Sequence, residues 1–299
     1  MDSFLPPKTL FHRPHFAKSK QIAKLLFNHV DAWVVSLTLV VIALSYHQAI
    51  NGQTTLLLLA IGLGYWLAFA LNDFYDAPFD AHDPAKALRN FFVRNPLSAG
   101  QVRAGLIAVG AFLLAVFAQF GGLGLATLVL CLGVMWAYSA PPLRLKSRPG
   151  LDLLTHALFV ETFPYLICLV LIEATWTSFD RVMLTLTGLA SLSAQLEQQA
   201  RDYAVDSKTD RNFTTTVGLA ATTWLLRLFT AVGLLIFFAA TLSGILSWWV
   251  AAVLLIALPT ALHRFTRPAN QPRSERLTFL LTGLGLVCIS LIFVAQLWR

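Results

Sequence analysis

The stretch NDFYDAPFD, residues 72–80, directly follows GLGYWLAFAL, residues 62–71, which is apolar enough to lie in lipid. An asparagine and three aspartates therefore crowd onto the end of a hydrophobic helix. On a continuous helix Asn72, Asp76 and Asp80 recur at every fourth residue and advance by about 40° per step, so they form one stripe. The spacing predicts a polar face where the helix leaves the apolar part of the membrane.

Two features of this stretch depart from the stripe. Asp73 has a different angular position, which makes it a partner for a helix end or for a neighbouring group rather than a member of the stripe. Pro78 removes one backbone hydrogen bond, so we expect the helix to kink or end there. Asp80, and Asp83 before Pro84, are then expected on bent or irregular chain.

The composition identifies the environment of the whole chain. Of the 299 residues 57% are hydrophobic and 12% are charged, and the mean hydropathy is +0.68, well above that of a soluble domain. Apolar segments this long cross a bilayer as helices, because the backbone must satisfy its own hydrogen bonds in lipid. We expect an all-α membrane protein, a single domain over residues 1–299, with nine transmembrane helices. The expected spans are 32–50, 54–72, 104–120, 122–139, 151–172, 179–198, 222–243, 246–263 and 277–297.

The net charge of +7 would suggest nucleic-acid binding in a soluble chain, but the distribution of charge indicates membrane topology instead. Of the 22 Lys and Arg residues, only Arg181 and Arg299 fall on the side opposite to the others. The positive-inside rule then predicts a multi-pass protein of the cell membrane with a cytoplasmic N-terminus and an external C-terminus. The basic segment 1–25 lacks a central apolar run and is not expected to be a cleavable signal peptide.

A second acid-rich stretch repeats the pattern of the first. In QLEQQARDYAVDSKTDR, residues 195–211, Gln198, Asp202, Asp206 and Asp210 again recur at every fourth residue. Either stripe could be a solvated helix end that is paired with nearby Lys and Arg. Two matched stripes that both reach back into apolar spans instead favour a bound cation, since like charges this close repel each other. Oxygen ligands of this kind suit Mg²⁺, which commonly uses one or two carboxylates together with substrate phosphates.

Three motifs in this order resemble those of a known family. NDFYDAPFD fits the NDxxDxxxD signature of the UbiA superfamily of intramembrane prenyltransferases, and RDYAVD at 201–206 fits its second DxxxD signature. Between them, YSAPPLRLKSRPG at 138–150 is similar to the YSxPPxRLK loop of that family. The resemblance implies a helical bundle around a central cavity that is capped by cytoplasmic loops. It also implies Mg²⁺-dependent transfer of an isoprenoid chain from a prenyl diphosphate to a lipophilic acceptor.

The resemblance also assigns roles to individual residues. One Mg²⁺ would be held by Asn72, Asp76 and Asp80, and the other by Asp202 and Asp206. The diphosphate would be bound by basic residues that could otherwise be ordinary topological anchors, namely Arg144, Lys146, Lys208 and Arg201. Asp76 and Asp206 would thereby act in catalysis, together with Tyr138 near the reacting carbon or the acceptor. Asp210 extends the second stripe, and Glu161 is an acid inside an apolar span that faces either the cavity or a neighbouring helix.

One departure from the family pattern concerns the acceptor. Many relatives that prenylate aromatic head groups carry an RPxPSG segment, where this chain has RNPLSAG at 94–100 with Asn95 in place of the Arg. An aromatic quinone-type precursor is the first expectation, with a carotenoid or a glycerol lipid as alternatives. A transporter that uses membrane carboxylates, and a non-catalytic assembly protein on the same fold, are the competing functions. Transport sites gather near the bilayer midplane, whereas these acids gather near one surface.

Overall fold

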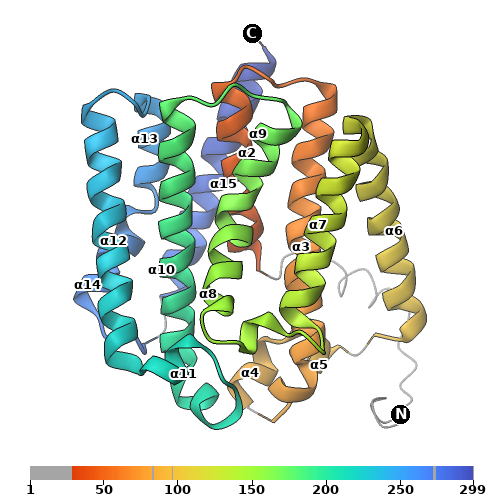
Figure 1. Ribbon diagram of the computed structural model, residues 1–299, viewed down its shortest axis with the longest axis vertical. Coiled ribbons are helices and arrows are strands. Elements are labelled where there is room, and N and C mark those ends of the chain that lie inside the picture. The colour runs from red at the N-terminus through yellow and green to blue at the C-terminus, as the bar shows by residue number, and fades with distance from the viewer. Residues whose placement is uncertain (1–28, 83, 96, 272–273, 299) are drawn as a thin grey trace.

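The computed structural model describes residues 29–82, 84–95, 97–271 and 274–298. The expected basic segment 1–25 and Asp83 lie outside these ranges. Within them all regular secondary structure is helical, and the helices form a bundle that runs along the long axis of the molecule (Figure 1). The all-α class expected from the composition is confirmed.

Seven long helices are continuous. They are α2 (Val30–Tyr46), α3 (Gly52–Asp80), α6 (Ala99–Phe117), α7 (Gly121–Ser139), α10 (Ser178–Thr209), α12 (Leu219–Leu242) and α15 (Glu275–Leu297). Two further segments expected as single spans are interrupted. The first comprises α8 (Leu151–His156), a π-helical turn (Ala157–Thr162) and α9 (Phe163–Leu171). The second comprises α13 (Trp248–Leu255) and α14 (Leu258–Thr266), which are bent by 45° against each other.

Three short helices lie together at one end of the bundle, below the long helices in Figure 1. They are α4 (Pro84–Arg89), α5 (Phe91–Arg94) and α11 (Phe213–Val217). The connection between α7 and α8, which carries the YSAPPLRLK sequence, runs past the same end. The acid-rich ends of α3 and α10 therefore meet the basic connection there.

Local sequence fixes where these helices begin. Asn51 accepts a hydrogen bond from the backbone N–H of Thr54, and Thr54 returns one to the backbone N–H of Asn51, so α3 begins in a capping box. Thr177 and Asp180 form the same arrangement at the start of α10. These caps satisfy backbone donors that would otherwise be unpaired at the helix ends.

The expectation that the helix could end at Pro78, with Asp80 on irregular chain, is wrong, since α3 continues through Pro78 to Asp80. The proline removes only its own N–H from the helix. The next available donor is used normally, because the backbone N–H of Ala81 lies 3.1 Å from the carbonyl oxygen of Ala77. Asp80 therefore stays on the regular helical stripe with Asn72 and Asp76.

Apolar length alone identifies only part of the expected membrane topology. Among the described residues, five helical stretches are long and apolar enough to cross a bilayer, or six if the bent α13–α14 pair counts as one span. One of the five, Gly100–Ser139, includes both α6 and α7. Helix α10 does not belong to this set because its sequence is rich in polar residues. Several of these polar side chains, including Ser191, Ser193 and Gln195, are buried inside the bundle rather than turned to lipid. The count of nine spans stays a prediction.

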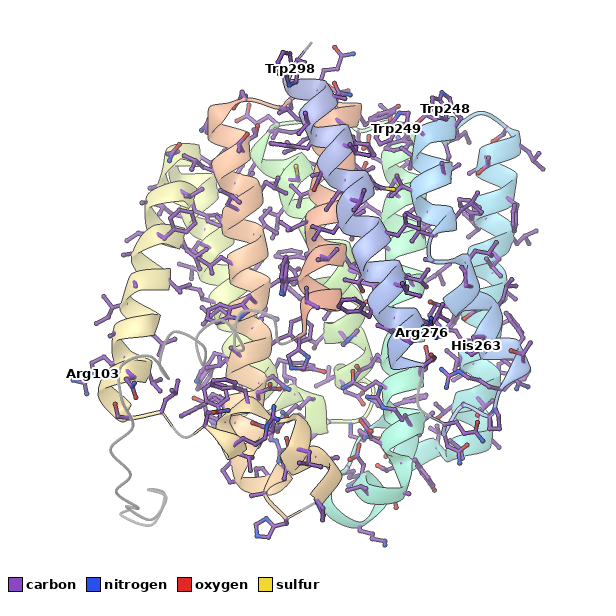
Figure 2. The ribbon with its side chains drawn as sticks, turned by 180° about the vertical axis from the view of Figure 1, so that it is seen from behind. Arg103, Trp248, Trp249, His263, Arg276 and Trp298 are labelled. Atoms are coloured by element: carbon purple, nitrogen blue, oxygen red, sulfur yellow. The ribbon has the colours of Figure 1, made fainter. Side chains whose placement is uncertain are left out.

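The two ends of the bundle differ in the side chains they present. Figure 2 shows Trp248, Trp249 and Trp298 at the end where the chain finishes, and Arg103 and Arg276 away from it toward the opposite end. Tryptophan is enriched at membrane interfaces, and basic residues collect on the cytoplasmic side. This polarity agrees with the orientation expected from the sequence, which also remains a prediction.

Candidate active site

A cavity of about 940 Å³ lies inside the bundle, and residues from α2, α3, α7, α10, α12 and the α13–α14 pair line it. Much of its wall is apolar and includes Met135, Phe159, Phe163 and Phe237. The acids at the ends of α3 and α10 line the cavity at the end where the short helices lie. The cavity therefore combines an apolar chamber with a charged end.

The first acidic stripe is in direct contact with the basic connection between α7 and α8. Lys146 Nζ lies 2.5 Å from Oδ1 of Asp76 and 2.8 Å from Oδ1 of Asn72. Ser139 Oγ, at the end of α7, also donates to Asn72 Oδ1 at 3.3 Å. The structure thus brings two of the sequence motifs, which were found independently, to one point.

Arg144 links the two stripes. Its NH2 group lies 3.5 Å from Oδ1 of Asp76 on α3 and 3.6 Å from Oδ2 of Asp210, which follows α10. Its guanidinium carbon lies 4.5 Å above the centre of the Phe79 ring, in a cation–π arrangement that fixes the direction of the side chain. Arg144 is therefore positioned to interact with an anion that binds between the stripes.

Burial affects the charge state of the loop lysine. Burial lowers the pKa of Lys146 below its usual value, and the neighbouring Asp76 carboxylate offsets this effect only in part. The side chain of Lys146 is only 12% exposed, so few water molecules can solvate its ammonium group.

The second stripe has a cationic partner of its own. Lys86 Nζ, on the short helix α4, lies 2.9 Å from Oδ1 of Asp206, while Asn212 Nδ2 donates to Asp206 Oδ2 at 3.1 Å. Burial acts to lower the pKa of Lys86, but the Asp206 hydrogen bond and the surrounding carboxylates outweigh it, so the pKa is raised. Asp202 is paired with Arg201, whose Nε lies 3.2 Å from Oδ1.

Asn90 fixes the segment that carries α4 and α5 on the end of α3. Its side-chain amide donates to Asp80 Oδ2 and to the backbone oxygen of Asp73, both at 2.8 Å. Its side-chain oxygen accepts from the backbone N–H of Phe92 at 2.9 Å and so caps α5. Asn90 is buried, and these three bonds tie the start of α5 to the end of α3.

Asp152 connects three helices behind the site. This buried carboxylate, on α8, accepts hydrogen bonds from Gln199 Nε2 on α10 at 2.6 Å and from the backbone N–H of Phe213 on α11 at 2.7 Å. Gln199 in turn accepts from the backbone N–H and the hydroxyl of Thr214. These bonds position the end of α10 that carries Asp202 and Asp206.

The sequence candidates Tyr138 and Glu161 also line the cavity. Tyr138 lines the cavity and accepts a hydrogen bond from Gln195 Nε2 at 3.4 Å. Glu161 is half-buried, lines the cavity and lies in the π-helical turn. The Tyr65 hydroxyl donates to the backbone oxygen of Phe159 in that turn. Such turns are commonly found at functional sites because they re-aim side chains within a helix.

The remaining candidates differ in how well their positions fit the expected roles. Arg201 and Gln198 line the cavity, whereas Lys208 is exposed and lies outside the cavity lining. Asp73 is directed away from the stripe, as its angular position predicted, and both its carboxylate oxygens lie within 3.1 Å of His29 Nε2. The sequence alone did not single out Lys86, Asn90, Asn212 or Asp152.

The donor atoms of the two stripes fit magnesium in chemical type. All are carboxylate or amide oxygens, from Asn72, Asp76 and Asp80 on α3 and from Asp202 and Asp206 on α10. Among the described residues no group of three or more His, Cys, Asp or Glu side chains could hold a metal ion by itself. Mg²⁺ does not require such a group, because it is usually bound by one or two carboxylates, water and substrate phosphates. The assignment of these residues as metal ligands remains a prediction.

These features define the class of protein: an all-α, multi-pass membrane protein whose internal apolar cavity ends in acidic and basic side chains. Residues 34–296 match the UbiA prenyltransferase family, and the chain belongs to that family. The resemblance drawn from the three motifs is confirmed.

Solved structures share the fold. A UbiA homologue from Archaeoglobus fulgidus bound to DMAPP and Mg²⁺ superposes with a TM-score of 0.66 at 17% identity, over 90% of this chain and 99% of that chain. The same homologue bound to GPP and Mg²⁺ gives a TM-score of 0.67 at 18% identity with the same coverage. At this level of identity the likeness concerns the fold.

A curated relative matches over a shorter region. The lycopene elongase/hydratase of Haloarcula japonica is 34% identical over 92 residues, which are 31% of this chain and 31% of that protein. The chain therefore matches less than a third of the length of this relative.

Proposed function

We propose that this protein is a Mg²⁺-dependent prenyltransferase that moves an isoprenoid chain from a prenyl diphosphate to a lipophilic acceptor within the membrane. The observation that carries the proposal is the convergence of two acidic stripes and a basic connection at one end of an apolar cavity. A prenyl diphosphate has the same division, with a highly anionic head and a hydrocarbon tail. The head would bind among the charged residues and the tail would extend along the apolar wall.

The reaction replaces a carbon–oxygen bond to diphosphate with a bond to the acceptor. The acceptor loses one proton, and diphosphate leaves with the electron pair of the broken bond. Bound Mg²⁺ would neutralise the charge that develops on the leaving diphosphate. Asp76 and Asp206 would anchor that metal, and Arg144 and Lys146 would contact the diphosphate oxygens directly through charge-assisted hydrogen bonds.

The apolar part of the cavity suits the allylic carbon, which gains carbocation character as diphosphate leaves. Aromatic faces interact favourably with such a cation, and Tyr138, Phe159 and Phe163 line the cavity beyond the charged end. An apolar wall also excludes water, which would otherwise capture the cation. Tyr138 is assigned to this environment rather than to the metal.

For the acceptor we favour a carotenoid-type polyene over the aromatic quinone-type precursor that is the first expectation for the family. Two observations support this choice. The segment 94–100 lacks the Arg of the RPxPSG pattern found in many relatives that act on aromatic head groups. The local similarity to a lycopene elongase/hydratase points to the same acceptor class.

The test is a direct assay with purified protein in detergent or lipid. Labelled dimethylallyl or geranyl diphosphate is incubated with Mg²⁺ and with either lycopene or an aromatic quinone precursor, and diphosphate release and labelled product are both measured. Prenylated polyene is the expected product. Product from the aromatic acceptor alone would overturn the proposed acceptor class. An absence of diphosphate release with every acceptor would favour transport or an assembly role.

The proposal includes a location and an orientation. The protein lies in the cell membrane with its N-terminus in the cytoplasm and its C-terminus outside. Donor would then bind from the cytoplasmic side, where the charged end of the cavity lies, and the acceptor would come from the lipid. No nucleic acid is involved, since the basic residues follow the topology of the spans.

A further inference from the structure

Each acidic stripe is paired with one lysine. Lys146 contacts Asp76 in the first stripe, and Lys86 contacts Asp206 in the second at 2.9 Å. Lys146 belongs to the basic connection that the sequence already marked as part of the site. Lys86 belongs to DAHDPAKALRN, residues 80–90, which precedes the RNPLSAG segment where this chain departs from the family pattern. No role in the site has been assigned to it.

The position of Lys86 is set by the fold. Asn90, four residues further along the chain, is bonded to both Asp80 and the backbone of Asp73 and so ties this segment to the end of α3. From there the side chain of Lys86 reaches α10. The negative charges of Asp206, Asp202 and Asp80 all act on its ammonium. One ammonium therefore lies among carboxylates of both stripes.

We propose that Lys86 is a tethered cation that occupies the second metal position in the donor-free protein and moves to the diphosphate when metal and donor bind. This inference rests on the proposed prenyl transfer and adds to it a donor-binding residue and an order of events. Lys86 stabilises Asp206 until the metal arrives, and the same charge then stabilises the donor.

The reason is a competition for one oxygen atom. Mg²⁺ binds carboxylate oxygen at roughly 2.0–2.1 Å, and a metal at Asp206 Oδ1 would lie within a few ångströms of the ammonium now found there. Two positive charges at that distance repel each other strongly in a partly buried site. Lys86 must therefore leave Asp206, and a bound diphosphate is the nearest new anion. Its long flexible side chain allows this movement without a change in α4.

Removing the charge of Lys86 should therefore have two effects of opposite sign. In Lys86→Gln the side chain can still donate a hydrogen bond to Asp206, but it no longer competes electrostatically with a cation. Metal affinity without donor is expected to rise roughly two- to fivefold, as the loss of a partly exposed ion pair implies. Donor affinity at saturating metal is expected to fall about tenfold, because a charge-assisted contact to phosphate is lost.

Metal affinity is measured on the full-length protein from a Mn²⁺ binding isotherm followed by electron paramagnetic resonance, with no donor present. Donor affinity is measured separately from prenyl diphosphate binding at saturating Mg²⁺. Lys86→Arg keeps the charge and should keep metal affinity at the wild-type value. Arg103→Gln removes one exposed positive charge at the same end of the bundle (Figure 2) and should change neither affinity. In Lys86→Gln/Asp206→Asn the gain in metal affinity should disappear, since the contested carboxylate is gone.

The outcomes separate this inference from the proposed function. If Lys86 only fastens α4 to α10, Lys86→Gln lowers the melting temperature and leaves metal affinity equal to or below that of the wild type, which overturns the inference. An active wild-type enzyme with that result would leave the proposed function intact. If the wild type releases no diphosphate with any acceptor, the proposed function fails whatever the metal isotherm shows. A gain in metal affinity together with a loss in donor affinity supports the tethered cation.

Discussion

Lys146 Nζ lies 2.5 Å from Asp76 Oδ1, although 70 positions separate the two residues in the chain. One belongs to the connection after α7 and the other to the acidic end of α3. The contact brings the acidic motif and the basic connection together at the charged end of the cavity. It also neutralises a carboxylate that would otherwise be poorly solvated beside the cavity.

The carboxylates at the centre of the site should be essential for turnover. In Asp76→Asn and Asp206→Asn a metal-binding charge is lost, so the charge that develops on the leaving diphosphate is poorly countered. We expect turnover to fall roughly a hundredfold or more, with a melting temperature near that of the wild type because Asn keeps the shape of the side chain. Turnover and thermal stability are measured across a range of Mg²⁺ concentrations. Active variants with unchanged Mg²⁺ dependence would refute the metal site.

The basic residues of the connection between α7 and α8 should act on donor binding. Arg144→Ala and Lys146→Ala each remove a contact to phosphate, and the KM for donor should rise about tenfold or more. Arg144→Lys should restore binding only in part, since a point charge replaces a planar fork that also stacks on Phe79. The measurement is donor binding in parallel with turnover. Normal values for both alanine variants would mean that these residues are topological anchors.

Lys208 offers a comparison on the same helix as Asp206. Its sequence position suggested a diphosphate contact, but its side chain is exposed and outside the cavity lining. We therefore expect Lys208→Ala to change the KM for donor by less than about twofold, as is usual for an exposed charge. A loss comparable to that of Lys146→Ala would show that the end of α10 moves when donor binds.

Asp152 should be important for stability and, through it, for the position of α10. Asp152→Ala leaves the Gln199 amide and the Phe213 N–H without their acceptor in a buried site. The expected loss is about 3 kcal/mol, seen as a lower melting temperature in detergent. The melting temperature of Asp152→Asn, which keeps an oxygen acceptor, should lie between those of the alanine variant and the wild type. An unchanged melting temperature for the alanine variant would contradict this role.

The topology is tested with reporter fusions at two connections. A fusion at Gln119, between α6 and α7, should report the outside, and one at Pro268, after α14, should report the cytoplasm. The expectation follows from the distribution of Lys and Arg along the chain. Reports from the same side would disprove the predicted orientation.

The sequence by itself determined the features that depend on local chemistry. The helical class follows from apolar segments that must satisfy their backbone within lipid. The stripe of Asn72, Asp76 and Asp80 follows from helical periodicity, which also placed Asp73 on another face. The family could be identified because its motifs are short and contiguous in the chain.

The tertiary structure decided which groups meet. The positive-inside pattern treated Lys86, Lys146 and Lys208 alike, since it depends only on their distance from a span. The first two reach carboxylates and the third is exposed, because the path of the backbone and the packing of the helices set the direction of each side chain. Asp152 likewise reads as an ordinary acid near a helix start until α8, α10 and α11 close around it. Hydrogen bonds and ion pairs act over a few ångströms in space, and positions far apart in the chain acquire those distances only when the helices pack.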